Sequence, residues 1–228
     1  MRAPSRVRRS VAGMRIVIAG GHGQVARLLN RQLADAGHTP VALFRKASQT
    51  DEVVATGAEP LVLDLEKATR DEVAAALAGA DAAVFAAGAG PGSGPARKKT
   101  VDRDAAILFA DGAVAAGCRR FVLLSAIGAD DFDPSLDDDF EIYLEAKSAA
   151  DGAVRDMDLD WTILRPDGFT DKPGTGKVNV GETVTRASIP RADVAAVIAA
   201  LVTGGLAVHR QFEVTTGDTP IAETLAAL

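Results

Sequence analysis

The sequence predicts an α/β fold with a doubly wound, parallel sheet that has helices on both faces. Short apolar segments typical of buried strands recur along the chain, at 15–19, 39–44, 60–63, 81–86, 120–124 and 160–164. The segments between them have the apolar periodicity of helices, which is the pattern of successive βαβ units with right-handed crossovers. The chain has 228 residues, of which 47% are hydrophobic, enough for an ample core in one domain. We therefore expect a single Rossmann-like domain over residues 14–228.

The first predicted strand leads into a glycine turn and then into an amphipathic segment, VARLLNRQLADAG, that is predicted to be helical. Gly20 allows a tight turn, Gly23 allows a ligand to approach the backbone, and Ala26 lets the helix pack close to the sheet. The helix N-terminus attracts anions, so this turn is typical of a site for a dinucleotide pyrophosphate. The spacing alone is a weak signal, because an ordinary tight turn can contain the same glycines.

The second predicted strand ends at two cations, Arg45 and Lys46, just over twenty residues after Gly23. A domain specific for NAD usually places a carboxylate here for the ribose 2′-hydroxyl, whereas a cation accommodates a 2′-phosphate. The planar fork of Arg45 suits a phosphate, and Lys46 adds a second charge. We therefore predict NADP(H) as the cofactor; the alternative is a solvated basic pair at a strand end.

Capping residues indicate where three helices begin. Ser48 with Asp51 and Thr69 with Glu72 resemble capping boxes, in which the first side chain and the last bond to each other's backbone. Thr219 precedes a proline, which predicts a cap followed by proline at the first helical position.

Two segments are predicted to be irregular loops. Residues 88–96, GAGPGSGPA, are too rich in Gly and Pro for regular structure and are expected to form a mobile loop after the fourth strand. Residues 130–141 hold seven carboxylates in twelve positions. Their spacing matches no calcium loop, so a solvated acidic loop is the first interpretation and a metal site the second.

Candidate catalytic residues follow the fifth predicted strand. Ser125 stands at the end of that strand, and Tyr143 precedes Lys147 by four positions in a helix predicted over 138–155, so both lie on one helix face. A phenol that donates a proton near neutral pH needs its pKa lowered, and Lys147 can supply the field. Ser125 can then orient the substrate oxygen. The alternative is a chance pair on a solvated helix face.

The charge and cysteine content of the sequence indicate which classes of partner and which cellular location to expect. The net charge is −6, and residues 1–13 carry four arginines and no acid, so residues 14–228 carry −10, which argues against nucleic acid. Residues 1–13 are expected to be a disordered basic arm rather than a signal peptide. No segment has the length of apolar residues that a membrane helix needs. The single cysteine, Cys118, predicts a reducing, cytoplasmic location and a small core residue.

From Met14 to Leu228 the sequence resembles the atypical short-chain dehydrogenases/reductases of the NAD(P)-binding, NmrA-like group, often labelled NAD-dependent epimerases. The resemblance rests on GGHGQVA at 20–26, Asp64–Leu65, AAGAG at 86–90, KTVDRDAA at 99–106, RRFVLLSAIG at 119–128, YLEAK at 143–147, LDWTILRP at 159–166, GTGKV at 174–178, IPRADVA at 189–195 and GDTPI at 217–221.

The resemblance implies a Rossmann sheet with a small C-terminal substrate region, which we place mainly at 166–190 and 205–228. It implies NADP binding, with Asp64 and Leu65 near the adenine. Asp102 resembles the aspartate that replaces the asparagine of mainstream reductases and joins the catalytic candidates. Further implied cofactor contacts are Gln24, Val25, Ala86, Ala87, Gly88, Lys147 and Pro166.

One turn departs from the family pattern. The turn after the sixth strand usually reads R-P-G, whereas this chain has Arg165-Pro166-Asp167-Gly168. Asp167 is interpreted first as a turn residue. The alternative is that it faces the substrate.

The leading hypothesis for function is an NADP(H)-dependent oxidoreductase or epimerase that acts on a small carbonyl or hydroxyl compound, with Tyr143 as the acid/base. One alternative is a regulatory protein that senses NADP(H) without turnover and needs neither Tyr143 nor Lys147. Another is a reductase of flavins or tetrapyrroles with an open pocket. The identity of the substrate and the oligomeric state stay open.

Overall fold

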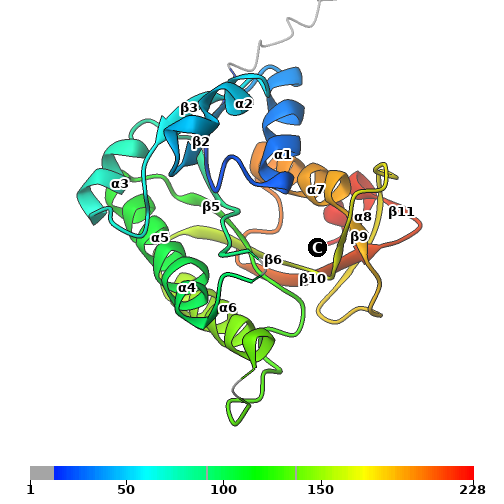
Figure 1. The fold of residues 1–228 in the computed structure, drawn as a ribbon. Coiled ribbons are helices and arrows are strands. Elements are labelled where there is room, and N and C mark those ends of the chain that lie inside the picture. The colour runs from blue at the N-terminus through cyan, green and yellow to red at the C-terminus, as the bar shows by residue number, and fades with distance from the viewer. Residues whose placement is uncertain (1–12, 91, 137) are drawn as a thin grey trace, which may run out of the picture.

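The structure is organised around one mostly parallel sheet (Figure 1). The computed structural model describes residues 13–90, 92–136 and 138–228. Within these ranges nine strands pair in the order β11-β8-β10-β6-β5-β4-β1-β2-β3. Every pairing from β3 to β10 is parallel, whereas β8 pairs antiparallel with both of its neighbours. The predicted doubly wound, Rossmann-like fold is confirmed.

The six predicted strands all form, with small shifts at their ends. They are β1 (Arg15–Ala19), β2 (Thr39–Phe44), β3 (Glu59–Val62), β4 (Ala82–Phe85), β5 (Arg120–Leu124) and β6 (Asp160–Pro166). Strands that were not predicted extend the sheet: β10 (Arg210–Thr216), β8 (Lys177–Gly181) and β11 (Thr219–Pro220). A separate pair joins β7 (Phe169–Thr170) to β9 (Ile189–Pro190).

The helices form two layers, one on each face of the sheet (Figure 1). On one face, α1 (Gln24–Asp35) packs against α7 (Arg191–Gly204), which α8 (Ile221–Ala226) also contacts. On the other face lie α3 (Arg70–Ala76), α5 (Ala106–Ala116) and α6 (Asp139–Arg155). The short elements are η1 (Ala47–Gln49), α2 (Thr50–Val54), α4 (Pro95–Arg97) and the π-helical segment η2 (Lys98–Ala105).

Each layer has its own apolar core, because alternate residues of a strand point to opposite faces. Ile16 and Ile18 of β1 join the core beneath α1 and α7. Val17 and Ala19 of the same strand join the core beneath α3, α5 and α6. Burial on both faces explains why β1, β2, β4, β5 and β6 appear in the sequence as apolar runs.

The three predicted helix starts have different outcomes. The Thr69–Glu72 capping box is confirmed, since the Thr69 hydroxyl accepts from the Glu72 N–H and the Glu72 carboxylate accepts from the Thr69 N–H at 2.8 Å. The prediction for Ser48 is wrong, because this residue lies inside η1 and caps no helix. The prediction for Thr219 is also wrong: it belongs to β11, and α8 begins only after Pro220.

The two predicted loops are shorter than expected, because a helix begins inside each of them. Helix α6 starts at Asp139, so 139–141 are helical, and the Asp138 carboxylate caps them by accepting from the Phe140 N–H at 2.7 Å. In 88–96, Pro95 begins α4. Most of the predicted arm, residues 1–12, lies outside the described residues. No helix in the described ranges has the length and apolar character needed to cross a membrane.

Candidate functional site

The carboxyl ends of the strands border two adjoining cavities. The first, of about 210 Å³, extends from the turn after β1 to the ends of β2 and β3. The second, of about 440 Å³, lies over the ends of β4 and β5 and beside α6. Ala86, Ala87 and Gly88, directly after β4, line both. The strand order reverses between β1 and β4, so the cavities lie where open α/β sheets bind their ligands.

The turn between β1 and α1 has room only for glycine at two positions. Gly20 has a φ of +75°, and a Cβ atom there would lie 2.5 Å from the Cα of Ala87. A Cβ at Gly21 would lie 2.5 Å from the Cβ of Ala42 on β2, a contact that local sequence does not reveal. The Asn30 amide donates to the Gly21 carbonyl at 3.1 Å and holds the turn against α1. Gly20 and Gly23 line the first cavity, so this part of its wall is backbone without a side chain.

Helix α1 starts at this turn without a side-chain cap. Gly23 is the N-cap residue and provides no side-chain cap. The first N–H groups of a helix, here those of Gln24 and Val25, have no partner within the helix. The Gln24 side chain is exposed and that of Val25 is buried. An anion at this point would therefore be bound by the backbone of these two residues.

The walls of the first cavity at the ends of β2 and β3 are largely apolar. Asp64 and Leu65, which the family resemblance implied, do line this cavity. The apolar side chains of this lining are Leu43, Phe44, Leu63, Val101 and Ala105, and His22 and Gln49 also line it.

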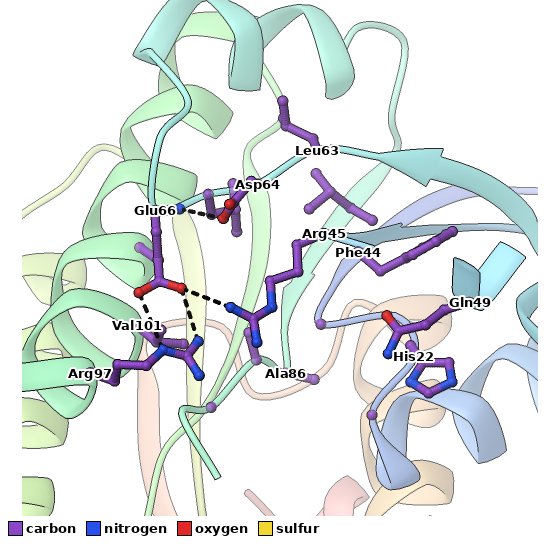
Figure 2. Close-up of a pocket in the computed structure, with 17 residues that line it drawn as sticks. His22, Phe44, Arg45, Gln49, Leu63, Asp64, Glu66, Ala86, Arg97 and Val101 are labelled. Atoms are coloured by element: carbon purple, nitrogen blue, oxygen red, sulfur yellow. Dashed lines mark hydrogen bonds and ion pairs between the residues drawn. The ribbon is translucent and has the colours of Figure 1, made fainter. Parts of the chain in front are cut away.

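Two guanidinium groups face one carboxylate in the first cavity (Figure 2). Arg45, predicted from the end of β2, has its Nη1 3.4 Å from Glu66 Oε2. Arg97 on α4 donates from Nη2 to the same oxygen at 2.9 Å and from Nε to Oε1 at 3.4 Å. Neither Arg97 nor Glu66 was predicted, because they meet only in the fold. Lys46 is exposed and does not line the cavity.

All four catalytic candidates, Ser125, Tyr143, Lys147 and Asp102, line the second cavity. The Lys147 ammonium lies 3.3 Å from Asp102 Oδ1 and donates to the Leu124 carbonyl at 3.1 Å. It also lies 5.6 Å from the centre of the Tyr143 ring, since the two residues are one helical turn apart. Asp102 belongs to η2, and π-helical segments are frequent at functional sites.

The pKa of Tyr143 differs from the expectation. Burial raises the pKa of the phenol, Lys147 opposes this rise, and the carboxylates of Asp102 and Asp151 add to it, so that the result lies above the ordinary value. The phenol therefore keeps its proton at neutral pH. Lys147 does lower the pKa of Tyr143, as expected, but burial raises this pKa by more.

A buried carboxylate holds the Ser125 hydroxyl. Ser125 donates to Asp151 Oδ2 at 2.8 Å, and the same oxygen accepts from Nε and Nη2 of Arg165 at 2.9 and 2.8 Å. Arg165 also binds both oxygens of Asp130, at 2.7 and 2.8 Å. Because a serine hydroxyl has one proton and Asp151 accepts it, the Ser125 oxygen has only lone pairs to offer to the second cavity. Sequence reasoning missed this role of Asp151.

The turn after β6 lies outside both cavities. Pro166 is buried, lines neither cavity, and accepts from the Ile127 N–H at 3.1 Å, so its cofactor contact stays a prediction. The Asp167 carboxylate accepts from the Gly168 N–H at 2.8 Å and from Arg186 at 3.2 Å. These are the contacts of a turn residue.

Several residues of the second cavity had no recognisable signal in the sequence. The Lys98 ammonium lies 3.0 Å from Asp139 Oδ2 and also donates to the Asp139 carbonyl. Phe140 and Phe169 add apolar surface. Within the described residues, no group of three or more His, Cys, Asp or Glu side chains is placed to hold a metal ion.

The chain is similar to known proteins along most of its length. The model of a family described as NAD(P)H-binding matches residues 20–204. The uncharacterized sugar epimerase YhfK of Bacillus subtilis is 35% identical over 94% of this chain and 100% of its own length. A Bacillus halodurans structure assigned to the NAD-dependent epimerases/dehydratases is 38% identical with a TM-score of 0.88, over 95% of this chain and 100% of its own. The oxidoreductase ylbE of Lactococcus lactis is 28% identical with a TM-score of 0.83, over 94% of this chain and 96% of its own.

Proposed function

Because this chain belongs to the NAD(P)H-binding family, with the fold of the atypical short-chain dehydrogenases/reductases, we propose that it is an NADP(H)-dependent oxidoreductase or epimerase. Its substrate is a small carbonyl or hydroxyl compound. The observation that carries the proposal is the junction of the two cavities at Ala86–Gly88, which links an anion-binding turn to the cluster of Tyr143, Lys147 and Asp102. We further propose a cytoplasmic location, as expected from the single cysteine.

The residues of the first cavity fit the coenzyme. Gly20 lets the turn after β1 pack directly against the backbone of Ala86 and Ala87, and the α1 N-terminus offers N–H groups to a pyrophosphate. The apolar ends of β2 and β3 suit an adenine. Arg45 and Arg97 suit a 2′-phosphate, because the guanidinium fork binds phosphate oxygens in pairs.

In the second cavity the reaction needs a proton donor beside the substrate oxygen. When bound, NADPH would supply a hydride for the carbonyl carbon. Tyr143 gives its phenolic proton to the oxygen that becomes the hydroxyl, and Lys147 stabilises the phenolate that is left. Asp102 and the Leu124 carbonyl hold the Lys147 ammonium in position. Ser125 accepts a hydrogen bond from the hydroxyl form of the substrate, since it donates its own proton in a hydrogen bond to Asp151.

The second cavity favours a neutral, largely apolar substrate. Each of the four charged side chains that line it already has an opposite partner: Lys147 pairs with Asp102, and Lys98 pairs with Asp139. Much of the remaining lining is apolar, and it includes Phe140 and Phe169. An anionic substrate would have to break one of these pairs, which costs free energy in a partly buried site.

We expect uncharged aromatic aldehydes or ketones to be reduced with a kcat/KM at least about tenfold above that of 2-oxo acids of similar size. Initial rates of NADPH oxidation, measured over a panel matched in size, test this. A preference for 2-oxo acids would show that one of the two lysines is available to bind a carboxylate.

Arg45→Ala is expected to weaken NADPH binding by about tenfold or more and to leave NADH affinity within about twofold, because only NADPH has the 2′-phosphate. Fluorescence titration of both coenzymes measures the two dissociation constants. Lys46→Ala removes a neighbouring charge that does not line the cavity, and serves as the matched control with little expected change. Equal binding of NADPH and NADH by the wild type would contradict the assignment of Arg45.

A further inference from the structure

A carboxylate already lies in the position that the two guanidinium groups offer to an anion. Glu66 Oε2 accepts from Arg97 at 2.9 Å and from Arg45 at 3.4 Å, and Figure 2 shows its side chain directed between theirs. Its other oxygen accepts from the Thr100 hydroxyl at 2.7 Å and from Arg97 Nε at 3.4 Å. One carboxylate thus uses donors of both cations.

The cluster is positioned to be rearranged by a ligand. The side chains of Glu66, Arg97 and Arg45 are 22%, 33% and 43% exposed, and all three line the first cavity. The hydrogen bond from Arg97 is the largest of several contacts that hold the pKa of Glu66 below its ordinary value. Glu66 is therefore an anion at neutral pH, within the cavity that we assign to the adenosine half of the coenzyme.

We propose that Glu66 sets the coenzyme selectivity by acting as an internal competitor for the 2′-phosphate. This inference rests on the proposed function. A 2′-phosphate must either displace the Glu66 carboxylate from Arg45 and Arg97 or share them with it, and two anions so close repel each other. A coenzyme with a 2′-hydroxyl leaves the ion pairs intact. Glu66 therefore lowers the affinity for NADPH and not that for NADH.

Glu66→Gln tests the proposal, because glutamine keeps the size and the acceptor for Thr100 but removes the charge. We expect affinity for NADPH to rise about 3- to 10-fold and affinity for NADH to change by less than about twofold. Titration with 2′,5′-ADP and 5′-AMP repeats the comparison on the adenosine half alone. There the gain should appear only with 2′,5′-ADP.

The matched control is Glu59→Gln, which removes an equal charge from an ion pair with Arg15, 3.2 Å long, outside the cavity. It should change none of the four affinities, and thermal unfolding verifies that both variants fold. An unchanged NADPH affinity in Glu66→Gln would overturn this inference but not the proposed function. The same holds if Glu66→Gln loses affinity only for NADH and 5′-AMP, which is the result expected of a carboxylate that accepts a hydrogen bond from a ribose hydroxyl. A wild-type protein that binds neither coenzyme overturns the proposed function and this inference together.

Discussion

Replacing Tyr143 with phenylalanine is expected to lower NADPH-dependent turnover by about 10²- to 10⁴-fold, which is the usual contribution of a positioned general acid. The substitution removes only the hydroxyl. The ring keeps its contact with Phe140, at 6.1 Å between centroids, and the Lys147–Asp102 pair is left in place. Coenzyme affinity should therefore stay within about twofold of the wild type. Steady-state kcat with the best carbonyl substrate and a dissociation constant for NADPH measure the two effects separately.

The pH profile of the wild type adds a second test of the same role. Burial raises the pKa of Tyr143, so the phenol holds its proton through neutral pH. Carbonyl reduction uses the protonated phenol and should stay constant until alkaline pH, where it falls. Alcohol oxidation needs the phenolate and should rise over the same alkaline range. Unchanged turnover in Tyr143→Phe would eliminate the phenol as the proton donor, and NADPH binding without turnover on any substrate would favour a sensing protein.

Local patterns predicted those parts of the molecule that depend on neighbours in the sequence. The six predicted strands were visible as apolar runs, although β3 is largely exposed, and the turn from Gly20 to Ala26 was visible from its small residues. Tyr143 and Lys147 were recognised because a helix brings positions four apart together. Strand β10 was missed, since Phe212 and Val214 are its only apolar side chains and it lies near the edge of the sheet.

Contacts between distant residues could not be predicted in the same way. Gly21 is required by Ala42 on the neighbouring strand, and Arg97 meets Glu66, 31 residues earlier in the chain, only in the folded protein. The acceptor of the Ser125 hydrogen bond, Asp151, lies 26 residues away in the C-terminal half of α6. Each of these pairs depends on tertiary packing, so no spacing in the sequence reveals it.

The largest expected effect on stability belongs to Arg165, whose removal leaves a carboxylate buried without its cation. Arg165 and Asp151 are 6% and 0% exposed, and they are joined by two hydrogen bonds. Breaking such a pair from one side typically costs about 3–5 kcal/mol, so Arg165→Met should lower the free energy of unfolding by that amount at neutral pH. Arg186→Met, which breaks an exposed pair with Asp167, should cost at most about 1 kcal/mol and is the control.

The loss of unfolding free energy in Arg165→Met should be smaller at acidic pH. The direction of this pH dependence follows from the pKa of Asp151. Burial already raises the pKa of Asp151 and Arg165 opposes this rise, so the pKa rises further in the variant. A carboxyl whose folded pKa exceeds its unfolded value keeps its stability below the unfolded pKa and loses it as pH rises through the folded pKa. Urea unfolding at pH 5 and pH 8 should therefore show the larger deficit at pH 8. Adding Asp151→Asn to Arg165→Met removes the unpaired charge and should restore much of the lost stability. A double variant no more stable than Arg165→Met would show that Arg165 contributes packing rather than charge.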